Sequence, residues 1–405
     1  MKFQIQNIMF YGTSLCKLGY KNIVLAAVII VNLNCYAQNI AVEIKNTLNF
    51  NRKEIVVIEA KQFTDKQNSL RIKKEGTKEY LPVQWIDYNS DGKPDEILFQ
   101  ADVPAKSSIK YDLIFDDKIA APGRKQAAFA RFVPERSDDF AWENDKIAFR
   151  VYGPKGQEEA LKDIQGSTLS SGVDIWLKKV ADPVIDKWYG RNLKSPGYYH
   201  TDHGEGYDPY HVGNSRGVGG TGILINDSLQ VSKNFIGYKV IAKGPLRTVF
   251  ELDYSFYSDY KIKETKRISL DVGSNFSKFE VSLSADSKIK DYAIGISLHQ
   301  NKGDVKINRR SGWFSHWESI DDSFVGEGIV IDRKFVKEAF AKVSKVADQS
   351  NLLVVTKAKD KITYYAGFAW QKSGQIKSVT DWDMLLEKQA LILKNPLKVT
   401  LKNNQ

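Results

Sequence analysis

The stretch RTVFELDYSFY (Arg247–Tyr257) decides the fold, because apolar and polar side chains alternate along it for the length of a long β-strand. Two runs of the same kind follow it closely, Thr265–Val272 and Phe276–Leu283. Within the last run, Phe279 and Val281 fall on one face of the strand, where they can enter a core. Such long, closely spaced runs are typical of antiparallel sheets that each bury one face, so we expect a large β-sandwich.

The rest of the chain repeats this pattern on a shorter scale, and helical periodicity is almost absent. Runs rich in β-branched and aromatic residues alternate with turn-forming residues, which predicts an all-β protein. We expect a smaller N-terminal β region over residues 38–120 and the main antiparallel β-sandwich, carrying catalysis, over residues 121–405, with a basic link at Pro122–Lys125. The further predicted strands are Ile40–Ile44, Glu54–Glu59, Leu81–Ile86, Ile109–Phe115, Ile147–Tyr152, Gly222–Ile225, Tyr238–Ala242, Ile294–Leu298, Ile362–Trp370 and Ala390–Leu401.

Residues 1–37 have the pattern of a secretory signal peptide. An apolar run, Ile23–Leu33, follows Lys17 and Lys21, and small residues, Cys35 and Ala37, stand three positions and one position before a cleavage point after Ala37. The run is too short for a transmembrane helix. We therefore expect a periplasmic or secreted protein with no membrane attachment once the signal has been removed.

The composition of the mature chain narrows its chemistry and its partners. Both cysteines, Cys16 and Cys35, lie in the predicted signal, so the mature chain has no thiol. Disulfides, thiolate metal sites and cysteine nucleophiles are thereby excluded. The signal contains three lysines and no acid, so its removal lowers the formal net charge from +10 to +7. A basic protein outside the cytoplasm favours an acidic oligosaccharide over nucleic acid as its anionic partner, although evenly spread lysines also serve solubility alone.

A turn in the N-terminal region has the front half of a calcium loop. Asp87, Asn89, Asp91 and Asp95 supply oxygen ligands at positions one, three, five and nine, and a glycine stands at position six. Leu98 occupies position twelve, so the bidentate glutamate of such a loop is missing. Two interpretations stay open. The loop holds a structural calcium ion, or it is an Asx-rich hairpin turn that needs the same residues for backbone hydrogen bonds.

The stretch Tyr198–Gly222 is the strongest candidate for a functional site. It holds three of the five histidines, four tyrosines, three carboxylates, one arginine and seven glycines. Histidine exchanges protons near neutral pH, and glycine lets the backbone approach a ligand closely. The alternative is a long surface loop whose polar side chains cap its own turns. The candidate residues are Tyr199, His200, His203, His211 and Arg216.

Two kinds of chemistry fit this stretch. Imidazole and carboxylate ligands could hold a divalent metal ion, but the spacing of the three histidines matches no established motif. Proton transfer without a metal needs a base, an acid and a cation for a substrate carboxylate, and such a set can drive β-elimination on a uronic acid. A glycosidase would instead need two facing carboxylates. The candidates for such a pair, none of them fixed by the sequence, are Glu143, Glu205 and Glu251.

A second group of candidates lies outside this stretch. Trp142 and Glu143 stand in a segment rich in arginine and carboxylates, which is typical of a wall that stacks on a sugar ring. A core tryptophan beside a surface salt-bridge cluster is the equal alternative. Arg150 follows in the next predicted strand, and His299 ends another, where it faces the same cleft or has a structural role.

Four motifs carry a resemblance to a known family. They are Arg131–Asp145 (RFVPERSDDFAWEND), Ser171–Trp176 (SGVDIW), Tyr199–Gly206 (YHTDHGEG) and Arg216–Gly222 (RGVGGTG). On these residues the chain resembles a secreted family of polysaccharide-degrading bacteria, a domain family of unknown function, and is similar to the oligosaccharide dehydratases of pathways that degrade ulvan, a sulfated algal polysaccharide. The resemblance implies a mutarotase-like supersandwich. It also implies a lyase that removes water from a non-reducing-end uronic acid and leaves a 4,5-unsaturated sugar.

We therefore expect a carbohydrate dehydratase that requires no cofactor. In this hypothesis His203 takes the C5 proton, and Tyr199 or His200 protonates the departing C4 hydroxyl. The cations for the carboxylate are Arg216 and Arg150. The further substrate contacts are Trp142, Glu143, His211 and His299. The alternatives are a polysaccharide lyase or glycoside hydrolase, which shortens the same polymer, and a non-catalytic sugar-binding protein.

Overall fold

The computed structural model describes residues 40–123, 127–286, 289, 291–346, 348–357 and 359–403. The predicted signal peptide, residues 1–37, and two residues of the predicted basic link, Arg124 and Lys125, lie outside these ranges. All described residues belong to one compact unit, Gln38–Gln405. The predicted boundary at residue 120 therefore stays a prediction.

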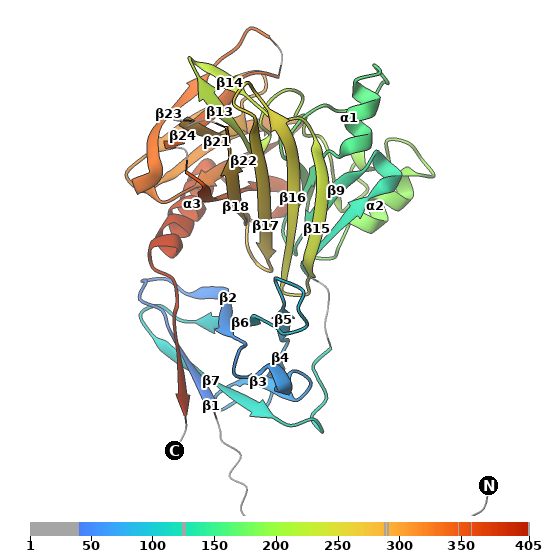
Figure 1. The fold of residues 1–405 in the computed structure, drawn as a ribbon. Helices are drawn as coiled ribbons and strands as arrows, with labels where there is room; N and C mark the ends of the chain where they lie inside the picture. The colour runs from blue at the N-terminus through green and yellow to red at the C-terminus, as the bar shows by residue number, and fades with distance from the viewer. Residues whose placement is uncertain are drawn as a thin grey trace, which may run out of the picture. The chain divides into compact units, whose positions relative to one another are not determined.

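The largest sheet has eight strands, and every neighbouring pair in it is antiparallel. Its long strands run side by side through the upper part of Figure 1. Alternation drives their formation: along Arg247–Tyr257 the buried residues include every second position from Thr248 to Tyr254. The order is β15 (Phe235–Lys243), β16 (Arg247–Tyr257), β17 (Ile262–Asp271), β18 (Phe276–Ser284), β25 (Lys361–Trp370), β22 (Ser323–Val330), β21 (Trp313–Ile320) and β20 (Asp304–Asn308).

Two five-stranded sheets pack on this sheet and enclose the main core. Phe250 of the large sheet stacks on Phe140, with ring centroids 4.3 Å apart, and contacts Trp142 at 5.1 Å. The Tyr364 hydroxyl donates a hydrogen bond of 2.6 Å to the Gly219 carbonyl of the other sheet. One sheet has the order β14 (Ser228–Gln230), β13 (Val218–Ile225), β19 (Asp291–Ser297), β24 (Asn351–Lys357) and β23 (Val336–Lys342). The other has the order β12 (Gly206–Tyr207), β11 (Asp174–Lys178), β10 (Ala148–Val151), β9 (Asp139–Glu143) and β8 (Phe129–Val133).

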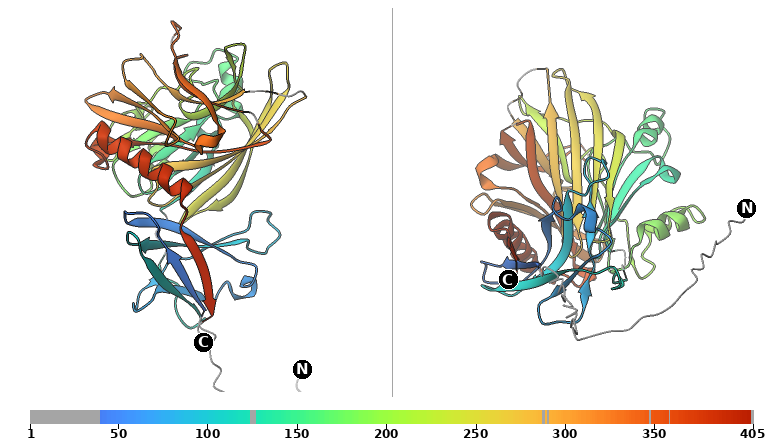
Figure 2. Two further views of the ribbon diagram at one scale, coloured as in Figure 1. Left: turned by 90° about the vertical axis from the view of Figure 1, so that its left-hand side faces the viewer. Right: turned by 60° about the horizontal axis from the view of Figure 1, so that its bottom comes forward.

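The N-terminal region forms two smaller sheets around a core of its own. The last strand of the chain, β26 (Lys398–Asn403), pairs with the first, β1 (Ile40–Lys45), as the red and blue strands of Figure 2 show. The end of the chain therefore completes the N-terminal region, whereas the sequence placed it with the main sandwich. The other strands are β7 (Ser108–Phe115), β3 (Leu70–Lys74) and β4 (Tyr80–Leu81) in the same sheet, and β2 (Arg52–Glu59), β6 (Glu96–Val103) and β5 (Gln84–Ile86) in the second.

Three α-helices accompany the sheets in the described part of the chain: α1 (Pro154–Ala160), α2 (Ile185–Asn192) and α3 (Val379–Lys394). The prediction of a strand from Ala390 was wrong, because α3 continues to Lys394. Ser378 caps this helix, and Trp382, Leu386 and Ala390 form a buried stripe at four-residue spacing. Trp382 and Leu386 pack against glycines of β22, so α3 covers the outer face of the large sheet (Figure 2). No described helix has the length and apolar character needed to span a membrane.

The architecture confirms the predicted all-β class, with a large antiparallel sandwich and a smaller N-terminal β region. The prediction was possible because the alternation of apolar and polar residues along a strand indicates which face of that strand meets the core.

Candidate functional site

The segment from Tyr198 to Val212 crosses the outer face of the β9–β11 sheet and connects two clusters of polar side chains. Its start is a single 3₁₀ turn, Tyr198–His200, and the Asp208 N–H then donates a hydrogen bond of 2.7 Å to the Tyr199 carbonyl. Gly206, with φ of 112°, pairs with Lys178 of β11. A Cβ atom there would lie 1.9 Å from the Leu177 carbonyl oxygen, so only glycine allows this close approach.

The first cluster, here called the arginine cluster, consists of Arg150, Asp139, Asp174 and Asp208. The Arg150 guanidinium donates to Asp174 at 2.5 Å and to Asp208 at 2.8 Å, and Asp139 lies 3.8 Å away. All four side chains are almost completely buried. The two short contacts compensate part of the buried negative charge. Three carboxylates surround one guanidinium, however, so one cation cannot neutralise all three of them.

Burial therefore decides the charge state of this cluster. It raises the pKa of Asp139 to about 6, although Arg150 and Arg136 oppose it. Burial, reinforced by the Asp174 charge, also raises the pKa of Asp208 well above its ordinary range, against the pull of Arg150. Asp139 and Asp208 therefore hold their protons more tightly than free aspartates do.

His200 lies at the solvent edge of this cluster. Its Nδ1 atom is 2.7 Å from the Asp208 carbonyl oxygen, and its side chain is 55% exposed. A carbonyl oxygen only accepts hydrogen bonds, so the proton of the neutral ring sits on Nδ1. The Nε2 lone pair of His200 has no hydrogen-bond partner within the described part of the chain and faces away from Nδ1, as a general base requires.

Tyr199 connects His200 to two arginines. Its hydroxyl oxygen accepts hydrogen bonds from Arg136 Nε at 3.2 Å and from Arg150 Nη1 at 3.5 Å, and its ring centroid lies 4.5 Å from that of His200. Tyr199 is 3% exposed, and because both arginines only donate, its hydroxyl proton has no acceptor in the described part of the chain. Arg136 ends the 3₁₀ turn Pro134–Arg136 and is partly exposed. The Arg136 Nη2 atom donates to the Gly166 carbonyl, which leaves Nη1 without a partner among the described residues.

His203 and His211 are exposed and less firmly held. The His203 ring stacks on Tyr198, with centroids 4.1 Å apart. The His211 side chain, 70% exposed, contacts Asp348 at 3.0 Å through Nε2. His203 and His211 therefore lie farther from the arginine cluster than Tyr199 and His200 do, and the predicted catalytic roles of these residues stay predictions.

The second cluster, here called the dyad cluster, consists of His299, Glu318, Glu327, His316 and Tyr210. The His299 Nδ1 atom is 2.6 Å from Glu318, and the His316 Nδ1 atom is 2.8 Å from Glu327. The Tyr210 ring lies edge-on to the His299 ring, with centroids 4.6 Å apart. Burial lowers the pKa of His299, but the hydrogen bond and charge of Glu318 outweigh burial and leave it raised. His299 thus contacts the Tyr198–Val212 segment, through the His211 carbonyl and the Tyr210 ring.

Two predicted site residues, Trp142 and Glu143, are consecutive on β9 and are both completely buried. Trp142 is 0% exposed, stacks on Phe149 and donates to Ser277 in the main core, so the prediction that it stacks on a sugar was wrong. Glu143 is also 0% exposed, because it accepts from Lys178 at 2.7 Å and from the first backbone N–H groups of α2. It anchors the N-terminus of this helix rather than a substrate.

The predicted roles of Arg216 and Arg150 as carboxylate ligands are also contradicted. Arg216 lies inside the sandwich, where it donates to Ser171 Oγ at 2.9 Å, and burial lowers its pKa to about 10 despite the charge of Glu264. Arg150 is 5% exposed and already bonded to aspartates. Arg136 is partly exposed and contacts Tyr199, whose ring contacts His200. It is therefore the arginine whose position suits a substrate.

The predicted calcium turn is closed by its own hydrogen bonds. The Asp87 carboxylate accepts the N–H groups of Ser90 and Gly92 at 2.7 and 2.8 Å. The Asp95 carboxylate accepts the N–H of Tyr88 at 2.7 Å, and Asn89 and Asp91 accept backbone N–H groups within the turn. These contacts are those of an Asx-rich turn, and calcium at this position stays a prediction.

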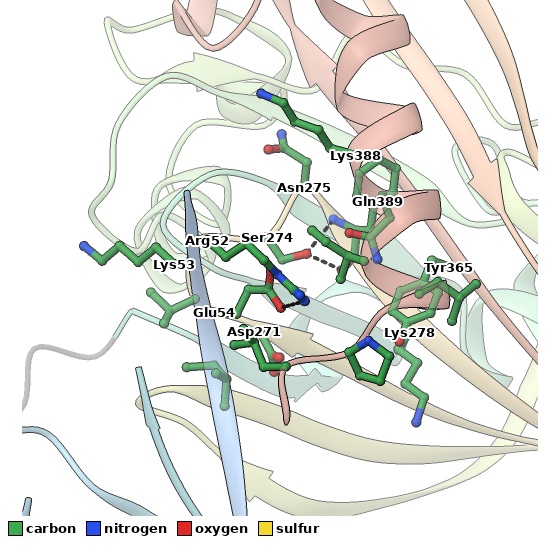
Figure 3. Close-up of a pocket in the computed structure, with 18 of the residues that line it drawn as sticks. Arg52, Lys53, Glu54, Asp271, Ser274, Asn275, Lys278, Tyr365, Lys388 and Gln389 are labelled. Atoms are coloured by element: carbon green, nitrogen blue, oxygen red, sulfur yellow. Dashed lines mark hydrogen bonds and ion pairs between the residues drawn. The ribbon is translucent and has the colours of Figure 1, made fainter. Parts of the chain in front are cut away.

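A groove of about 590 Å³ lies away from the histidines. Figure 3 shows its wall, where Arg52 pairs with Glu54 and several lysines extend from the surrounding elements. None of the five histidines lines this groove. It offers positive charge to a ligand, whereas proton-transfer groups gather at the Tyr198–Val212 segment.

Comparisons with known proteins agree with this architecture. A family model described as a domain of unknown function (DUF4861) matches residues 44–399. The chain belongs to this family. It is also 39% identical, over 360 residues, to uncharacterized protein P7 of Formosa agariphila, an alignment that covers 88% of this chain and 89% of that protein. The predicted membership of a family of unknown function is thereby confirmed.

Among solved structures, the fold is similar to that of a glycosyl hydrolase family 38 protein from Enterococcus faecalis. The TM-score is 0.50 at 9% identity, over 90% of this chain and 47% of that one. An α-mannosidase from Enterococcus faecalis matches with a TM-score of 0.43 at 8% identity, over 91% of this chain and 46% of that one. This chain spans about half the length of these two proteins. The likeness to the first of them, at 9% identity, shows a shared fold alone.

The site of this DUF4861 family member includes residues that the sequence analysis did not select. Asp174 and Arg136 lie within the quoted motifs, and Asp208 follows one of them. The motifs contain several charged residues each, so the sequence did not indicate which of them belong to the site. Glu318 and Glu327 gave a weaker signal. His316 and Glu318 alternate along β21, which indicates one shared face, but nothing local in the sequence pairs that face with Glu327 of β22.

Proposed function

We propose that the protein is a secreted carbohydrate-active hydro-lyase that removes water from the non-reducing-end uronic acid of acidic oligosaccharides of the ulvan type. The observation that carries the proposal is the constellation of Arg136, Tyr199 and His200. It joins a cation, a hydroxyl and an imidazole base through contacts of 3.2 Å between Arg136 and Tyr199 and 4.5 Å between the two rings. The motif resemblance and the fold shared with a carbohydrate-active protein support the substrate class.

Each of the three groups has a role that its position supports. The His200 Nε2 atom takes the C5 proton, and the electrons of that C–H bond form the C4–C5 double bond. The C4–O bond breaks, and the oxygen leaves as water with the Tyr199 hydroxyl proton. Arg136 holds the uronate carboxylate through its free Nη1 edge and stabilises the negative charge that develops there. His200 thereby replaces His203 as the base, because a carbonyl fixes its tautomer.

The buried arginine cluster holds Tyr199 and His200 in position. Arg150 donates to the Tyr199 hydroxyl and to Asp208, and the Asp208 carbonyl orients His200. A buried ionic network of this kind holds catalytic groups in place without touching the substrate. Arg150 is therefore a positioning residue in this proposal.

The test mixes the purified mature protein with saturated, uronic-acid-terminated oligosaccharides and follows mass and the absorbance of unsaturated uronates. We expect loss of one water with unchanged chain length. His200→Gln removes the base, and a decrease in kcat of about 100-fold to 10,000-fold is expected. His203→Gln is the matched control, since it changes an exposed histidine three positions along the chain, and it leaves kcat nearly unchanged.

Three other outcomes overturn the proposal, each in its own direction. Shorter products indicate a polysaccharide lyase or a glycoside hydrolase. Binding without any change in mass indicates a sugar-binding protein. Full activity of a folded His200→Gln variant excludes His200 as the base.

The Arg136→Lys variant, which loses the bidentate geometry, tests the role of Arg136. A rise in KM larger than the fall in kcat distinguishes substrate binding from a structural role.

A further inference from the structure

The dyad cluster contains polar atoms whose hydrogen bonds are incomplete although they are buried. Glu327 is 0% exposed, and its Oε1 atom has no hydrogen-bond partner among the described residues. The His316 Nε2 atom is also buried without a partner in that part of the chain, whereas the Tyr210 hydroxyl interacts with the Glu327 carboxylate. Unpaired buried groups are costly, and two together indicate a missing ligand.

The three inner residues of this cluster converge as the ligands of a metal ion do. His299, Glu318 and Glu327 each offer one ligand atom, and these atoms all lie within 4.8 Å of one another. Glu318 and Glu327 lie on the paired strands β21 and β22 of the large sheet, and His299 follows the end of β19 in the facing sheet. A metal bound by two or three of them would tie these strands together.

The backbone holds His299 in this position at a cost. Its φ is 41°, in the left-handed region that residues with a Cβ atom rarely adopt. Such strain persists where the surrounding structure fixes the residue, and it clusters at ligand-binding sites. The conformation directs Nδ1 to Glu318 and Nε2 to the His211 carbonyl at 2.8 Å.

The outer contacts of the cluster are those of metal ligands. A metal-binding histidine commonly donates its other ring N–H to a carbonyl, as His299 Nε2 does to His211, and this leaves Nδ1 as the metal-binding atom. The Glu327 carboxylate is held in the same way by His316 Nδ1 at 2.8 Å. Both contacts fix the ligands without occupying the atoms that face the centre of the cluster.

We propose that His299 Nδ1, Glu318 and Glu327 bind a divalent transition-metal ion of the zinc type. One imidazole and two carboxylates suit such an ion better than Ca²⁺ or Mg²⁺, which prefer oxygen ligands alone. The side chains of His299 and Glu318 are 17% and 12% exposed, so ions enter from solvent past these two residues. The Nδ1–Glu318 hydrogen bond opens as the ion takes its place, and the displaced protons leave to solvent.

The first experiment measures metal binding rather than activity, so its outcome is independent of the proposed hydro-lyase reaction. The mature protein is stripped with a chelator, dialysed against Zn²⁺ and analysed for bound metal by mass spectrometry of the elements. We expect one zinc ion per chain and a rise in the thermal midpoint on zinc addition. Substitution with Co²⁺ is expected to give visible absorption bands of a low-symmetry nitrogen and oxygen site.

Variants assign the site. Glu318→Gln, at a partly exposed position, keeps the shape of the side chain and is expected to weaken Zn²⁺ affinity about 100-fold or more, as is His299→Gln. His211→Gln is the matched control, because it changes an exposed imidazole but keeps the backbone carbonyl that orients His299. Its affinity for zinc is expected to stay within about threefold of the wild type.

Two results overturn the assignment. If zinc is not retained and the thermal midpoint does not change, Glu318 and Glu327 are a proton-sharing carboxylate pair without a metal. If zinc is retained equally by Glu318→Gln and is lost by Asp91→Asn, the ion binds at the Asx-rich turn of the N-terminal region.

Discussion

Replacement of Asp139 by asparagine tests whether burial governs the arginine cluster. Burial raises the pKa of Asp139 from the ordinary 3.8 to about 6, against Arg150 and Arg136. A carboxyl group whose pKa is higher in the folded state contributes stability below its unfolded pKa, and this contribution is lost as the pH rises through the folded pKa. The relevant window therefore extends from about pH 4 to about pH 6.

The size of the effect follows from the two pKa values. At 1.36 kcal/mol for each pKa unit, the difference between 3.8 and about 6 corresponds to about 3 kcal/mol of unfolding free energy. The side-chain amide of the Asp139→Asn variant keeps an oxygen for the Tyr189 hydroxyl, which donates to Asp139 at 3.2 Å, but it does not titrate. Relative to this variant, the wild type should thus lose about 3 kcal/mol between pH 3 and pH 7.

Urea unfolding at constant ionic strength, at several pH values in this window, measures the difference between the two proteins. Asp163→Asn serves as the control, because this carboxylate is exposed, and it should show little change across the same range. A difference between wild type and Asp139→Asn that is independent of pH would refute the reasoning. A difference of the opposite sign would show that Arg150 and Arg136 outweigh burial.

Two further substitutions test the structural roles assigned above. Lys178→Met removes the partner of fully buried Glu143 and should lower the unfolding free energy by about 3–5 kcal/mol in urea, whereas the double variant with Glu143→Gln should recover part of this loss. Trp142→Ala creates a core cavity and should cost about 3–5 kcal/mol, while oligosaccharide affinity, measured by calorimetry on the folded protein, should not change. A folded Trp142→Ala variant that loses affinity would restore the sugar-stacking role.

Much of the fold could be predicted from the sequence because strand alternation is a local signal. Arg247–Tyr257 was predicted as a strand and is β16 in the structure, with the same bounds. The signal failed at Ala390, which lies inside helix α3, because an apolar run near a lysine-rich tail is compatible with either element. The pairing of β26 with β1 joins the two ends of the chain, and no local pattern specifies a partner at that separation.

The site was predictable by region but not by residue. The density of histidine and tyrosine indicated the Tyr198–Val212 segment, since residue type alone reports proton-transfer capacity. Residue type could not show which of Arg150 and Arg136 is accessible to a substrate. The alternation of apolar and polar residues indicates the face of a strand on which a side chain lies, but not which other elements cover that face. Here α2 and Tyr199 cover it: Trp176, Trp188 and Tyr189 pack with Tyr199 over the strands, and Arg150 is sealed beneath them.

The same segment explains why the two polar clusters occur together. The Asp208 carbonyl orients His200, and three residues later the His211 carbonyl orients His299. Between them, the Tyr210 ring packs against His299. Because one short stretch of backbone sets the tautomer of both histidines, a movement that adapts the segment to a ligand at His200 also changes the position of the carbonyl that holds His299. The concentration of chemistry in this stretch therefore reflects a shared backbone support, in which neither histidine can be repositioned without affecting the other.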